Sequence, residues 1–190
     1  AIETLKSVST NDLSIRMEAQ FYLGRAYEEN GNRREAIDIF SRLVQGLPSD
    51  DEESKGNRLL FQQRLAANYW ETGEREKAIA LYQEMAKTDP KAKALLLQAY
   101  RINRQFDKAI PLGKEQFEKD PSNLQTGIEY AQALMDAGRG REGTEILNRL
   151  LQSNPEEVDL YIALSQLYMQ DKRFSEAEKI LLRAEEKNPK

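Results

Sequence analysis

Residues 20–48 read QFYLGRAYEENGNRREAIDIFSRLVQGLP, and this stretch decides the fold because its pattern recurs along the chain. An aromatic residue, a small residue and a proline each return at the same intervals of 42, 31, 34 and 34 residues. Three columns in one register indicate internal repeats. The proline column is Pro48, Pro90, Pro121, Pro155 and Pro189; the small column is Ala36, Ala78, Ala109, Gly143 and Ala177; the aromatic column is Tyr27, Tyr69, Tyr100, Leu134 and Tyr168.

These columns resemble the tetratricopeptide repeat, whose pattern is W-x2-L-G-x2-Y, then A-x3-F, then P. The resemblance implies an all-α fold, an α-solenoid in which antiparallel helix pairs form a right-handed superhelix. About five repeats and a leading half-repeat are expected. The first full repeat carries the pattern as Leu23-Gly24-x2-Tyr27, Ala36-x3-Phe40 and Pro48. The tryptophan is absent, and its place holds Gln20, Gln62, Lys93, Gly127 or Tyr161.

The register predicts one continuous solenoid domain. Its parts are the second half of a preceding repeat over 1–16, repeats over 17–50 and 59–92, an insertion or helix extension over 51–58, a shortened repeat over 93–123, and repeats over 124–157 and 158–190. Apolar residues at helical spacing predict helices over 12–30, 33–46, 52–72, 75–88, 91–103, 107–119, 122–137, 140–153, 156–171 and 174–187. Asp107 and Ser122 are the predicted N-caps, and Gly31, Gly73 and Gly138 the turn residues with positive φ.

Two places depart from the repeat. Residues 49–58 hold the insertion, where Ser49 and Glu52 have capping-box spacing that favours an acidic N-terminal extension of the next helix. A partner-contacting loop and a disordered segment are the alternatives. In the shortened repeat, Pro111 has no backbone N–H to donate, and Gly113 stands where the first full repeat has the large side chain of Phe40. Both changes indicate a soft joint or hinge, or a local adjustment without function.

Composition argues against most classes of enzyme. The chain has no cysteine and no histidine, so disulfides, thiol nucleophiles, the commonest general base and the commonest metal ligand are excluded. We therefore expect neither catalysis, nor a metal, nor another cofactor. The net charge of −4 disfavours nucleic-acid binding, and no apolar run is long enough to enter a membrane. The absence of cysteine fits a cytoplasmic and a periplasmic location equally well.

The resemblance places a binding groove on the first helix of each repeat, along the concave face. Three columns of exposed positions would line this groove. Glutamines 98, 132 and 166 would form an amide ladder able to pair with a peptide backbone, beside adaptable apolar side chains. The predicted groove residues are Phe21, Arg25, Gln63, Trp70, Gln98, Arg101, Ile128, Gln132, Met135, Ile162, Gln166 and Met169.

A carboxylate clamp of the kind known in this family is not expected. Its positions hold Phe21, Arg25, Arg64, Lys91 and Leu95, so both of its asparagines are missing. The resemblance implies a protein-interaction scaffold that binds a peptide segment or a helix. The alternative is a recruiting arm of a larger enzyme or secretion complex.

The chain begins and stops inside the repeat register, so we expect it to be a fragment of a larger repeat protein of bacterial type. Each repeat covers its apolar face with its neighbours, and the terminal helices would lack part of that cover. We expect exposed apolar side chains near Leu182 and at Ile2, Leu5 and Val8, and association through these ends.

Overall fold

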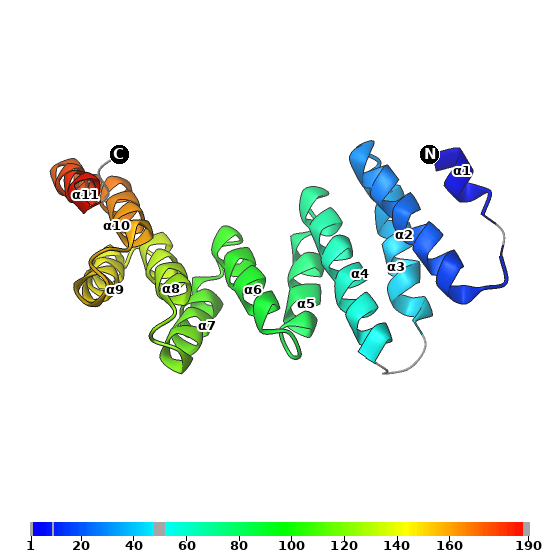
Figure 1. Ribbon diagram of the computed structural model, residues 1–190, viewed down its shortest axis with the longest axis horizontal. Helices are drawn as coiled ribbons and strands as arrows, with labels where there is room; N and C mark the ends of the chain where they lie inside the picture. The colour runs from blue at the N-terminus through cyan, green and yellow to red at the C-terminus, as the bar shows by residue number, and fades with distance from the viewer. Residues whose placement is uncertain (1, 9, 48–51, 188–190) are drawn as a thin grey trace. The chain divides into compact units, whose positions relative to one another are not determined.

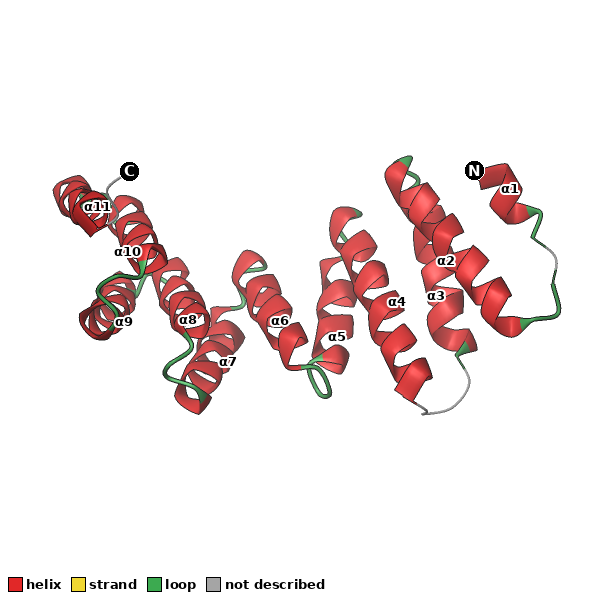
Figure 2. Cartoon of the chain, viewed as in Figure 1, coloured by secondary structure: helices red, strands yellow, loops and turns green. Residues whose placement is uncertain are grey.

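The computed structural model describes residues 2–8, 10–47 and 52–187, and in these ranges the chain forms helices and no strand (Figures 1 and 2). The all-α prediction is confirmed. The helices are α1 (Ile2–Lys6), α2 (Leu13–Glu29), α3 (Arg33–Gly46), α4 (Glu52–Glu71), α5 (Arg75–Met85), α6 (Pro90–Ile102), α7 (Phe106–Lys119), α8 (Leu124–Asp136), α9 (Gly140–Ser153), α10 (Val158–Gln170) and α11 (Phe174–Lys187).

The chain divides into two compact units, residues 1–93 and 94–190. In the first unit α2 packs on α3, α3 on α4, and α4 on α5, while α1 covers part of α2. The apolar core of this unit lies between α2, α3 and α4. Its buried residues are Leu23, Ala36, Ile39, Phe40, Leu43, Leu47, Phe61 and Leu65.

In the second unit each helix from α7 to α11 packs on the next one in the chain. Helix α9, the second helix of its pair, contacts α10, the first helix of the next pair. This contact between neighbouring pairs is the arrangement of a helical solenoid. The buried core is continuous from α8 to α11. Its residues are Ala131, Met135, Leu147, Leu150, Leu151, Leu160, Tyr161, Ala163, Leu164, Leu167, Tyr168, Ala177 and Ile180.

The small-residue column explains why paired helices approach so closely. Ala36, Ala78 and Ala109 have no exposed surface, and Ala177 has 3%. At Gly143 an added Cβ would lie 2.6 Å from the backbone oxygen of Ala131, so this repeat needs glycine rather than alanine. The column therefore marks the contact between the two helices of each pair.

The turn glycines are confirmed. Gly31, Gly73 and Gly138 have φ of 78°, 83° and 78°, the left-handed conformation that glycine adopts without a Cβ clash. The equivalent position holds Arg104 with φ 57° and Lys172 with φ 60°. Two of the five helix pairs thus keep the left-handed turn without glycine.

The prediction of both N-caps was wrong. Helix α8 is capped by Asn123, whose Oδ1 accepts from the Thr126 N–H at 3.3 Å, because Ser122 lies one residue too early and its backbone N–H and hydroxyl both donate to Asp120. Helix α7 begins at Phe106 after Gln105, which places Asp107 inside the first turn.

Pro90 was predicted to lie between the helices over 75–88 and 91–103, but it belongs to the second of them. It is the first residue of α6, a position where the missing N–H costs nothing. Pro121 and Pro155 follow the ends of α7 and α9 by two residues, as predicted.

The insertion is helical over residues 52–58, which supports the helix-extension interpretation for this part. Its proposed cap Ser49 lies outside the described residues, as do Pro48 and Pro189 of the proline column.

The ends agree with expectation only in part. Leu182 is 53% exposed and Val8 41%. Ile2 and Leu5 are instead half-buried, because α1 packs them against the core of the first unit. In the described residues no helix combines the length and apolarity that crossing a membrane requires.

Candidate protein-binding site

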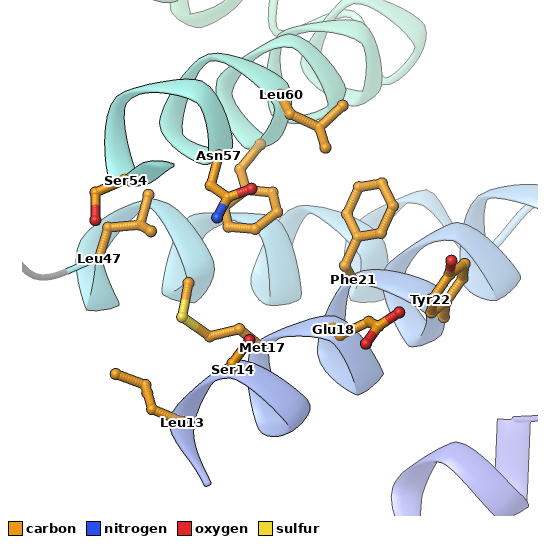
Figure 3. A pocket seen from close by; sticks show the side chains of 11 residues that line it. Leu13, Ser14, Met17, Glu18, Phe21, Tyr22, Leu47, Ser54, Asn57 and Leu60 are labelled. Carbon is orange, nitrogen blue, oxygen red and sulfur yellow. The ribbon is translucent and has the colours of Figure 1, made fainter. Parts of the chain in front are cut away.

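The main candidate site is a pocket between α2 and α4 in the first unit, with a volume of about 570 Å³ (Figure 3). Figure 3 shows apolar side chains from both helices turned toward this space, with the end of α3 contributing Leu47. The lining residues are Leu13, Ser14, Met17, Glu18, Phe21, Tyr22, Leu47, Ser54, Asn57, Leu60 and Phe61.

The pocket exists because α2 and α4 are longer than the equivalent helices. The first helices α8 and α10 have 13 residues each and begin three residues before the tryptophan position of the repeat. Helix α2 has 17 residues and begins seven before that position, and α4 has 20 and begins ten before it. Leu13, Ser14, Ser54 and Asn57 all lie in these additional turns, so the extensions form one end of the pocket.

Local contacts hold both extensions in place. The Asp12 side chain caps α2, because its Oδ1 accepts from the backbone N–H of Ser14 at 2.9 Å and of Ile15 at 3.2 Å. On the other side, the Arg58 guanidinium donates to the Val44 carbonyl oxygen at 3.4 Å and joins α4 to α3. The walls of the pocket therefore belong to ordered helices.

Aromatic rings in contact with one another form the floor of the pocket. The ring of Phe21 lies 5.7 Å from that of Phe61 and 6.1 Å from that of Phe40, the second contact being edge-to-face. Phe40 is fully buried and Phe61 is 4% exposed. Phe21 is half-buried, so it joins the core below to the pocket above.

Among the described residues, the rim of the pocket is apolar with a single charge. Leu13, Tyr22 and Leu60 are 42%, 47% and 37% exposed, an unusual density of large apolar side chains at one surface. Glu18 is the only charged residue among the eleven that line the pocket. This surface is suited to apolar side chains accompanied by a positive charge.

Only Phe21 of the predicted groove residues lines this pocket. Nearby, Arg25 pairs with Glu29 at 3.5 Å, Gln63 is exposed, and Trp70 stacks under the Arg75 guanidinium at 5.5 Å. The sequence signal that could have found the site is the position of the insertion, because its residues supply Ser54 and Asn57.

The three glutamines of the predicted ladder lie in different surroundings. Gln132 Nε2 donates to Gln170 Oε1 at 3.1 Å and to Asp136 Oδ1 at 3.4 Å, whereas Gln98 and Gln166 are exposed. Gln170 Nε2 also donates to Asp136 at 3.3 Å. Asp136 thus gathers the polar side chains of α8 and α10, one helical turn from the expected ladder.

Arg101 of α6 joins the same carboxylate, with its Nε 2.7 Å from Asp136 Oδ2. A second cavity of about 370 Å³ opens beside this pair. It is lined by Gln98, Arg101, Ile102, Arg104, Phe106, Asp136 and Gln170.

The apolar residues of the predicted groove differ in exposure: some are buried in the core and others lie at the surface. Met135 was wrongly expected at the surface; it is 7% exposed and packs in the core, with its methyl group against Gly140. Ile128 is half-buried against the same core. Ile162 and Met169 are exposed, at 42% and 45%.

Arg64, which stands at one of the clamp positions, already forms an ion pair within the first unit. Its guanidinium lies 3.4 Å from the Glu28 carboxylate, which also accepts from the Asn68 amide. Asn68 is fully buried, and Arg33 donates to its Oδ1 at 3.4 Å. These polar groups satisfy one another inside the first unit. No group of three or more acidic side chains in the described ranges is placed to hold a metal ion.

Comparisons with known proteins agree with the fold. Two family profiles, both described as tetratricopeptide repeat, match residues 100–157 and 134–190, and residues 18–48 and 62–92. No curated protein matches the chain.

Among solved structures, a putative kinesin light chain with nearly identical TPR-like repeats from Podosopora anserina aligns with a TM-score of 0.67 at 24% identity, over 90% of this chain and 94% of that one. MamA from MSR-1 aligns with a TM-score of 0.56 at 21% identity, over 92% and 97%. Another MamA structure gives 0.61 at 16% identity, over 90% and 91%. At these identities the likeness concerns the fold.

Proposed function

The chain belongs to the tetratricopeptide repeat family, whose fold supports protein–protein interaction, and we propose that it binds a segment of a partner protein in the pocket between α2 and α4. The observation that supports this proposal is the extension of both helices beyond the repeat. The repeat itself does not require these additional turns, since α8 and α10 form their pairs without them. Yet the turns provide part of the wall of this pocket.

The chemistry of the lining defines the segment. The volume of about 570 Å³ lies in the range of about 300–1,000 Å³ that is usual for ligand pockets. Leu13, Phe21 and Leu60 favour bulky apolar side chains, because their burial removes apolar surface from water. Glu18 at the rim favours a lysine or arginine beside them. We therefore expect a segment in which apolar residues are flanked by a basic residue.

Peptides selected from a displayed random library on the full chain provide the test. The paired variant Leu13→Ser with Leu60→Ser should weaken binding of the selected peptides about fivefold to thirtyfold, since losing two leucine contacts costs about 1–2 kcal/mol. The matched control is Ile15→Ser, because Ile15 is 51% exposed on the same helix and does not line the pocket.

A double-mutant cycle tests the role of Glu18. Exchanging the basic residue of a selected peptide for glutamine and Glu18 for glutamine should give less than the sum of the two single effects. Selected peptides that bind the Leu13 and Leu60 variant as tightly as the original chain would overturn the proposal. The same conclusion would follow if Ile15→Ser weakened binding equally.

A further inference from the structure

The cavity beside Arg101 combines two features that the packing of the second unit does not require. The first is the backbone of Arg104. Its φ of 57° lies in the left-handed region, at the turn position where three other helix pairs have glycine. A side chain in this conformation costs energy because its Cβ approaches the following carbonyl oxygen. Glycine at this position would relieve the cost, as Gly138 does in the next pair.

The second feature is a set of unused donors. Arg101 pairs with Asp136 through Nε, and its two terminal nitrogens have no partner in the described part of the chain. The Arg104 guanidinium has no hydrogen bond or ion pair there either. The amide of Gln98 lines the same cavity. Free guanidinium donors in a fixed fork match the two oxygens of a carboxylate.

Charge selects the ligand. Asp136 balances one of the two guanidinium groups, so the cavity keeps a single positive charge. That charge matches the single negative charge of a carboxylate, whereas a phosphate dianion carries twice that charge and would be repelled more strongly by the Asp136 carboxylate. The net charge of −4 on the whole chain also disfavours a nucleic-acid backbone. Ile102, which is 50% exposed, borders the cavity and offers an apolar contact beside the charge.

We propose that this cavity binds a glutamate or aspartate side chain from an acidic segment of a partner protein, with Arg104 and the terminal nitrogens of Arg101 as the donors. The site lies wholly within residues 98–170 and is independent of the pocket between α2 and α4.

The experiment uses the full chain, labelled with ¹⁵N, and the Nε–Hε NMR signals of its arginines. The probe is an acetylated and amidated pentapeptide, Ala-Leu-Glu-Glu-Ala, and the control probe has glutamine in place of both glutamates. The glutamate peptide should shift the signals of Arg101 and Arg104 in a saturable manner, and the glutamine peptide should not. Inorganic phosphate is titrated in parallel.

The decisive variant is Arg104→Gly, with Lys172→Gly as its matched control. Lys172 has the same backbone conformation, φ 60°, but does not line the cavity. Both variants relieve the turn, so both should unfold at the same temperature as the original chain or at a higher one. Arg104→Gly should weaken the glutamate peptide at least about fivefold, while Lys172→Gly should leave it unchanged.

Three results would overturn the proposal: equal binding of the glutamate peptide to both variants, equal binding of the two peptides, or tighter binding of phosphate than of the glutamate peptide. A lower unfolding temperature for Arg104→Gly than for Lys172→Gly would also overturn it, because Arg104 would then be retained for stability. The Leu13→Ser variant should bind the glutamate peptide normally, so failure at this site is distinguishable from failure at the α2–α4 pocket.

Discussion

Replacing Gly24 by alanine tests whether the pocket floor is as tightly packed as the distances indicate. Gly24 lies in the middle of α2, where an added Cβ would be 2.7 Å from Cζ and 2.9 Å from Cε1 of Phe40. Favourable carbon contacts lie at about 3.5–4.0 Å. The Phe40 ring is fully buried and contacts Phe21, so it has no free space into which to move.

Two effects of opposite sign decide the result. Alanine is the better helix former by about 1 kcal/mol, which alone would stabilise α2. Overpacking a close-packed core costs about 1–3 kcal/mol, and the distance of 2.7 Å places Gly24→Ala at the upper end of that range. We expect a net loss of about 1–2 kcal/mol in the free energy of unfolding.

The matched control is Gly46→Ala. Gly46 is the last residue of α3, and an added Cβ there would have nothing within 4 Å. Here the helix preference acts alone, so the variant should gain up to about 1 kcal/mol. Urea unfolding followed by circular dichroism should give opposite shifts of the midpoint for the two variants. A Gly24→Ala protein as stable as the original chain would refute the argument from packing.

Three further predictions concern local stability. Asp12→Ala should cost about 1 kcal/mol in unfolding free energy, while Asp12→Asn should retain most of it, because either oxygen can cap α2; urea unfolding measures both. Amide hydrogen exchange should be faster across α7 than across α3, because Pro111 lacks the N–H that would reach the Asp107 carbonyl; equal protection would contradict a soft joint. The hydrogen bond from Arg139 lowers the pKa of the Glu142 carboxyl in the folded chain. This pair therefore stabilises the fold above the unfolded pKa of about 4.3, and its contribution is lost as the pH falls through the lower folded pKa. The difference in urea midpoint between the original chain and Glu142→Gln should shrink on acidification.

The repeat columns allowed the helices and their close contacts to be predicted from sequence. Ala36 and Ala78 have no exposed surface, and Gly31 has the predicted positive φ, because each helix pair imposes the same steric demand at the same position. A steric requirement that recurs in every repeat produces a recurring residue type, which a single sequence is sufficient to reveal.

Side-chain pairing could not be predicted in this way. Gln132 donates to Gln170 rather than aligning with Gln166, because Asp136 lies one turn along α8 and attracts both amides and Arg101. Met135 shares a column with exposed Met169 but is buried, since Gly140, the first residue of α9, has no side chain and leaves space for the Met135 methyl group. Such outcomes depend on the particular neighbours of each residue, which the repeat register does not specify.

Both candidate binding sites lie where the chain departs from its own repeat. Column residues are held constant by packing, so they can form the scaffold but can contribute little to the choice of a partner. Additional helical turns and a substituted turn glycine are free of that demand. The first departure supplies Leu13 and Asn57 to the α2–α4 pocket, and the second supplies Arg104 to the acidic-segment cavity. In a helical repeat protein, a residue that breaks the register without a packing reason is therefore the better indicator of a binding site than the exposed members of the columns.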